Sequence, residues 1–167
     1  MLAFRGAPAG ARVIVSDAIW PLPSWIPQRW GPAAQAALAT AVRKRTSTIA
    51  ARGPISETLG AQGSTQIAVE VEPERCYIAS IALMKGASRG LRLAAAASAR
   101  PSSEEVSPTA GSPSVVFCAE GTDLARLTID VPGSSVWWVL AVWRLGALGA
   151  YGKEAAENAV VPAEGAR

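Results

Sequence analysis

Residues 115–131 read VVFCAEGTDLARLTIDV, and the pattern of this stretch decides the fold class. An apolar run ends at Cys118, and after a turn Leu127, Ile129 and Val131 alternate with polar residues. Alternation with a period of two places the three apolar side chains on one side of an extended chain. The stretch therefore predicts a half-buried β-strand.

Four other stretches also predict strands. Residues 65–72 (TQIAVEVE) show the same alternation, and residues 76–84 (CYIASIALM) are apolar on both faces, which is typical of a more central strand. Residues 90–99 (GLRLAAAASA) begin in a strand-like pattern. Residues 135–145 (SVWWVLAVWRL) follow a Pro132-Gly133 turn, which predicts a β-hairpin with the strand before it.

Strands that recur at short intervals with turn residues between them are typical of two packed antiparallel sheets. We predict a mainly β protein, an antiparallel, jelly-roll-like β-sandwich over residues 61–146. Residues 1–60 form an N-terminal extension with one short helix at about 32–46, and residues 147–167 form a flexible tail. Residues 100–114 (RPSSEEVSPTAGSPS) predict a long exposed loop, because serine, proline and glycine dominate them.

The extension is basic and rich in tryptophan. It holds seven basic residues against two acidic ones, and three of the six tryptophans of the chain. The basic groups could contact phosphates or anionic lipid, or they could simply keep the segment soluble. The candidate interaction surface consists of Trp20, Trp25, Trp30, Arg43, Lys44, Arg45 and Trp138.

Two kinds of contact fit this surface. The extension could pack on the sandwich or on a protein partner, including a second copy of the chain. Alternatively, residues 20–45 could bind a membrane surface, since tryptophan and basic side chains suit the lipid headgroup region. We expect no nucleic-acid partner, because tryptophan and arginine are not interleaved on a recognisable module.

The chain has two cysteines, Cys76 and Cys118, each at the end of a predicted strand. A disulfide between them would stabilise the fold by about 4 kcal/mol if the entropy of loop closure is the main contribution. The alternative is a pair of buried thiols, which behave as small apolar groups. No secretory signal is visible, which argues against a bridge unless a leader lies upstream of Met1.

Residues 86–90 (GASRG) match the G-x-S-x-G pattern of serine hydrolases, which makes Ser88 a candidate nucleophile. That chemistry needs a histidine to accept the hydroxyl proton, and the sequence contains no histidine. A serine hydrolase is therefore only a distant alternative. We expect no enzyme activity, no metal and no cofactor.

The stretch from Leu59 to Leu145 resembles bacterial secreted β-sandwich domains of the pre-peptidase C-terminal type. The similar segments are EPERCYIASIAL and SVVFCAEGTDLARLTIDV. The resemblance implies a β-sandwich, a bridge between Cys76 and Cys118, and no catalytic activity.

These features together predict a non-catalytic accessory or interaction module, a structural or assembly component of a bacterial envelope or a secreted one. We expect a protein partner or self-association. If the disulfide forms, the location is periplasmic, envelope or extracellular. The cytoplasm is the alternative, because the signal peptide is not visible.

Overall fold

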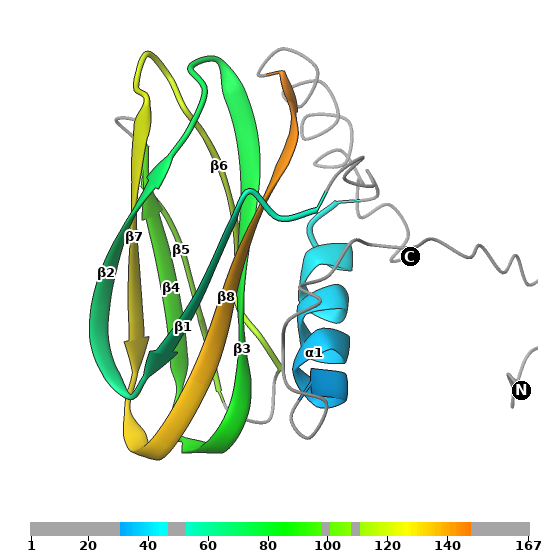
Figure 1. Cartoon of the computed structure of the whole chain (residues 1–167), viewed down its shortest axis with the longest axis vertical. Coiled ribbons are helices and arrows are strands. Elements are labelled where there is room, and N and C mark those ends of the chain that lie inside the picture. The colour runs from blue at the N-terminus through cyan, green and yellow to red at the C-terminus, as the bar shows by residue number, and fades with distance from the viewer. Residues whose placement is uncertain (1–30, 47–52, 98–100, 108–110, 148–167) are drawn as a thin grey trace, which may run out of the picture.

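Two antiparallel sheets of four strands pack face to face, with one helix outside them (Figure 1). The computed structural model describes residues 31–46, 53–97, 101–107 and 111–147. Sheet A contains, in spatial order, β1 (Ser56–Ala61), β8 (Gly133–Ala147), β3 (Arg75–Ser88) and β6 (Ser114–Cys118). Sheet B contains, in spatial order, β2 (Gly63–Glu70), β7 (Leu124–Val131), β4 (Leu91–Ala96) and β5 (Ser102–Val106).

The strand order is that of a jelly roll, which confirms the predicted fold class. Only β4 and β5 are consecutive strands that pair with each other; every other connection crosses from one sheet to the other. The predicted hairpin at Pro132-Gly133 is wrong for this reason. β7 pairs with β2 and β4, whereas β8 pairs with β1 and β3, so the turn carries the chain between sheets.

The main core lies between the sheets and consists of alternate side chains from both. The predicted inward residues Leu127, Ile129 and Val131 are all fully buried there. Tyr77 and Trp138 of sheet A face them across the sandwich. The period of two in the sequence therefore corresponds to the inner face of each sheet.

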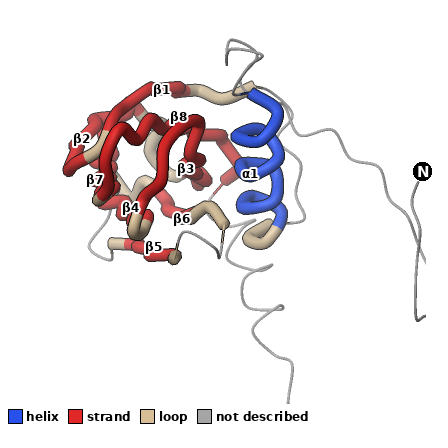
Figure 2. Tube along the Cα trace, turned by 90° about the horizontal axis from the view of Figure 1, so that it is seen from below, coloured by secondary structure: helices blue, strands red, loops and turns tan. Residues whose placement is uncertain are grey.

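The helix α1 (Gly31–Arg43) packs on the outer face of sheet A, against β3 (Figure 2). Its position agrees with the predicted helix. Leu38 and Val42 are fully buried with Ile78, Ala82 and Trp143 in a second apolar cluster. Because β3 contributes to both clusters, it is apolar on both faces, as its sequence predicted.

Two strands were not expected from the sequence. β5 lies inside the stretch 100–114, so the prediction of a continuous exposed loop there is wrong. Its polar sequence, SSEEV, is stabilised by pairing with β4 at the edge of sheet B rather than by apolar burial. β1 lies almost entirely within the range predicted as the extension.

Candidate interaction surface

The predicted disulfide between the two cysteines is present in the structure. Cys76 and Cys118 are bonded, with their Cα atoms 4.0 Å apart. They are directly opposite each other on the neighbouring strands β3 and β6, so the bridge lies within sheet A rather than between the sheets. Cys76 is fully buried. The bridge ties the edge strand β6 to the centre of its sheet.

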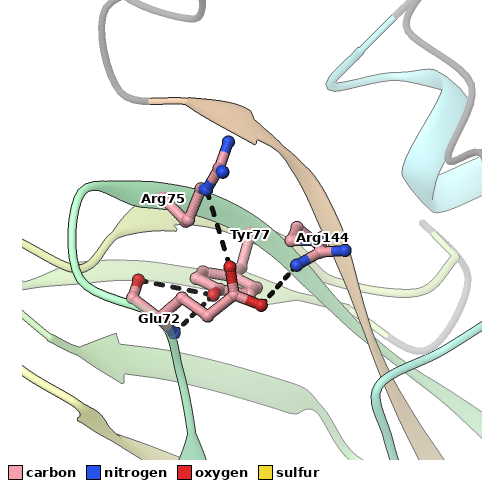
Figure 3. A network of polar contacts seen from close by, with 4 residues as sticks. All are labelled: Glu72, Arg75, Tyr77 and Arg144. Carbon is pink, nitrogen blue, oxygen red and sulfur yellow. Dashed lines mark hydrogen bonds and ion pairs between the residues drawn. The ribbon is translucent and has the colours of Figure 1, made fainter.

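Beside the disulfide, a polar network closes the end of the sandwich (Figure 3). The Glu72 carboxylate contacts Arg144, and its other oxygen lies 3.6 Å from Nε of Arg75. The Tyr77 hydroxyl accepts a hydrogen bond from the Glu72 N–H at 2.7 Å and donates to the Glu72 carbonyl at 3.4 Å. Tyr77 belongs to the core, so its hydroxyl fixes the β2–β3 connection to the sandwich.

A shallow hollow of about 310 Å³ adjoins this network. Its lining residues are Ile55, Glu70, Val71, Glu72, Tyr77 and Arg144. The one basic side chain in the lining, Arg144, is already paired with Glu72. The arrangement fits a structural clamp better than a binding site for an anion.

Ser88 is engaged in the turn between β3 and β4. Its hydroxyl contacts the carbonyls of Gly90 and Pro132, the second at 2.8 Å, and accepts the Gly90 N–H at 3.2 Å. The turn joins two strands, whereas the serine hydrolase motif needs a turn from a strand into a helix. Ser88 therefore links the β3–β4 turn to the β7–β8 turn.

The three basic residues at the C-terminal end of α1 have different environments. Arg45 forms an ion pair of 2.6 Å with Glu104 of β5, whose other carboxylate oxygen accepts the Ser114 N–H. Arg43 and Lys44 are exposed. The apolar side of α1 is buried on sheet A, so the helix presents no free apolar face in the described part of the chain.

Trp138 is not part of an exposed surface, which corrects its predicted role. It is fully buried in the main core, and its indole N–H donates to the Ala61 carbonyl at 2.7 Å. Gly60 lies opposite Trp138, and only the absence of a side chain there leaves room for the ring. The neighbouring Trp137 points to the other face of β8 and is 47% exposed. The other predicted tryptophans, Trp20, Trp25 and Trp30, lie outside the described residues.

Two of the exposed apolar side chains are neighbours at the β1 edge of sheet A. We call Leu59 and Trp137 the β1 strip. Leu59 lies within β1 and is 45% exposed, whereas the exposed Ile55, which directly precedes β1, lines the hollow beside Glu72 and Arg144. Leu59 pairs with Val139, which is two residues from Trp137 on β8, so Leu59 and Trp137 are diagonal neighbours on one face.

A single acidic residue lies on the same face. Glu57 pairs with Ala141, a fully buried member of the cluster beneath the helix. Burial raises the pKa of the Glu57 carboxyl above its ordinary value. Sequence reasoning missed Leu59, Glu57 and Trp137 as surface residues. The usable signal was the period of two in residues 135–145, which places Trp137 and Trp138 on opposite faces of the strand.

No protein-family model matches this chain, and no curated protein matches it significantly. The resemblance to secreted β-sandwich domains of the pre-peptidase C-terminal type therefore stays a prediction. Within the described residues, no helix has the length and apolar character that crossing a membrane requires.

Proposed function

We propose that the chain is a non-catalytic interaction module that binds a protein partner through the β1 strip. One observation carries this proposal. Four large apolar side chains of the described residues are exposed, and two of them, Leu59 and Trp137, are neighbours on one face of sheet A. Clustered apolar exposure on an otherwise well-packed sandwich is typical of a contact surface.

The outer face of sheet B differs from the β1 strip in its exposed side chains, and this difference supports the β1 strip as the contact surface. Apart from Leu124 at the start of β7, its exposed positions carry small or polar side chains, among them Gln66, Ala68, Arg92 and Arg126. Such a face is compatible with water, whereas Trp137 and Leu59 are not. The β1 strip is therefore the better candidate for a surface that a partner covers.

Two engaged groups support a non-catalytic role. The Ser88 hydroxyl bonds to main-chain carbonyls, and Arg144 in the hollow is paired with Glu72. The partners of the Ser88 hydroxyl are main-chain groups, which cannot take its proton as a general base, and Arg144 is held as a charged guanidinium beside Glu72. We expect a fluorophosphonate, which labels activated serines, to leave the protein unlabelled.

The disulfide supports an oxidising location, and we propose an envelope or secreted component. The membrane-binding alternative is less well supported, because the apolar side of α1 is occupied by sheet A. Flotation of the full chain with anionic vesicles tests it. Recovery of the protein with the vesicles, lost when Arg43 and Lys44 are changed to glutamine, would favour the alternative.

Site-specific photo-cross-linking tests the interaction surface. A photoreactive phenylalanine analogue is placed at Trp137, and at Thr128 on the outer face of sheet B as the matched control. We expect a cross-linked protein adduct from position 137 and none from position 128. No adduct from position 137, or equal adducts from both positions, would contradict the proposal.

A further inference from the structure

The main-chain groups of β1 are satisfied on one side only. Among the described strands, β1 pairs with β8 alone. The Gln62 N–H donates to the Val136 carbonyl just after β1, and hydrogen-bonding direction alternates along an antiparallel strand. The N–H and C=O groups of Glu57, Leu59 and Ala61 therefore point away from β8, toward the open edge of sheet A.

The other three edges of the sandwich are protected in ways that β1 is not. The edge strand β6 is held by the disulfide and by the Ser114 hydroxyl, which donates to the Ala41 carbonyl of α1 at 2.9 Å. The two edge strands of sheet B, β2 and β5, carry charged side chains such as Glu70 and Glu105. β1 carries one charged residue, Glu57, but it has no disulfide, lysine or proline and presents a large apolar side chain, and such an edge tends to pair with another strand.

We propose that a second copy of this chain pairs with β1 in antiparallel orientation, with Leu59 opposite its own copy. This inference rests on the proposed function and names the partner. A two-fold axis at Leu59 pairs Glu57 of each copy with Ala61 of the other, so all three outward-facing residues are hydrogen-bonded. The two sheets A then form one sheet that is continuous across the dimer.

Charge disfavours one alternative register. Sliding the strands until Glu57 lies opposite Glu57 would place two carboxylates side by side, which is unfavourable. In the proposed register Glu57 of each copy instead lies opposite the uncharged Ala61 of the other copy.

The exposed area sets the strength of this contact. A tryptophan buries roughly 150 to 250 Å² in full, so a ring that is 47% exposed has roughly 100 Å² left to cover. Both copies of the β1 strip together offer several hundred Å², below the roughly 1,200 Å² of a stable interface. We therefore expect a dimer that dissociates, with a Kd in the micromolar to millimolar range.

Sedimentation velocity on the full chain, from about 5 to about 500 µM, tests the dimer. The matched pair of variants is Leu59→Lys and Leu124→Lys, because Leu124 is 50% exposed but lies on β7, away from the open edge. Each dimer contains two copies of residue 59, so we expect Leu59→Lys to raise the Kd at least about tenfold. Leu124→Lys should leave it unchanged.

Hydrogen exchange on the unaltered protein tests the strand itself. Raising the concentration through the Kd should slow exchange of the Glu57, Leu59 and Ala61 amides and leave the outer strand β5 unaffected. A chain that is monomeric throughout, a dimer equally sensitive to both lysine variants, or a dimer without β1 protection would each overturn the inference. If the chain is monomeric but position 137 cross-links to a different protein, the proposed function stands and this inference alone fails.

Discussion

Replacing Gly60 by alanine tests the packing on which the sandwich depends. Gly60 lies opposite Trp138, and an added Cβ would lie 1.9 Å from ring carbon Cζ2. Gly60 is not among the glycines with positive φ, so alanine suits its backbone and the change acts through the clash alone. The ring cannot yield easily, because Trp138 is fully buried and hydrogen-bonded to Ala61.

The expected loss is about 3 kcal/mol in the free energy of unfolding. Overpacking a core costs roughly 1 to 3 kcal/mol, and removing a buried tryptophan costs roughly 3 to 5 kcal/mol, which limits what expelling the ring can cost. Gly146→Ala is the control, because Gly146 also lies in sheet A and nothing lies within 4 Å of a Cβ there. That variant should be neutral or slightly stabilising, by up to about 1 kcal/mol.

Urea denaturation followed by far-ultraviolet circular dichroism measures both variants. A double-mutant cycle with Trp138→Phe isolates the clash, since the smaller ring leaves room for the Cβ. In the Trp138→Phe protein, Gly60→Ala should lower the free energy of unfolding by less than about half of the amount by which it does so in the unaltered protein. A loss below about 0.5 kcal/mol, or the same loss in both backgrounds, would refute the packing of Trp138 against Gly60.

Three further perturbations follow from contacts at other sites. Changing Cys76 and Cys118 to serine should lower the unfolding free energy by up to about 4 kcal/mol, because the bridge spans 42 residues; a chemical denaturation midpoint equal to that of the unaltered protein would contradict this. Ser88→Ala removes a buried hydroxyl with three contacts and should cost about 2 kcal/mol, whereas an unchanged melting temperature would contradict the structural role. Burial raises the pKa of Glu57 in the folded state, so the fold binds more protons there than the unfolded chain does, and stability falls as pH rises from the unfolded pKa through the folded one. Glu57→Gln should therefore gain stability relative to the unaltered protein at pH 7 but not at acidic pH, and an equal difference at both pH values would argue against a raised pKa of Glu57.

The strands with strong alternation could be predicted from sequence because burial determines them. Val69 and Leu127 face the core where the period of two places them. The cysteines could be paired because each lies at the end of such a strand. Burial of one face of a strand requires apolar residues at alternate positions, and these strands show that alternation in their sequences.

The parts that were missed depend on pairing and on topology rather than on burial. β5 is polar and is held by main-chain bonds to β4, so it has the composition of a loop. The turn at Pro132-Gly133 does not reveal whether the next strand joins the same sheet or the opposite one. Trp137 and Trp138 are neighbours of the same type on opposite faces of β8, and the sequence does not tell which of these faces is covered by the second sheet.

The central claim is that β8 directs Trp138 and Trp143 into the protein and Trp137 to its surface. Hydroxyl-radical footprinting with mass spectrometry measures this directly, at a dilution where the chain is monomeric. We expect rapid oxidation of Trp137, which is 47% exposed, and strong protection of Trp138 and Trp143, which are fully buried. Oxidation of Trp138 or Trp143 as fast as that of Trp137 would contradict it.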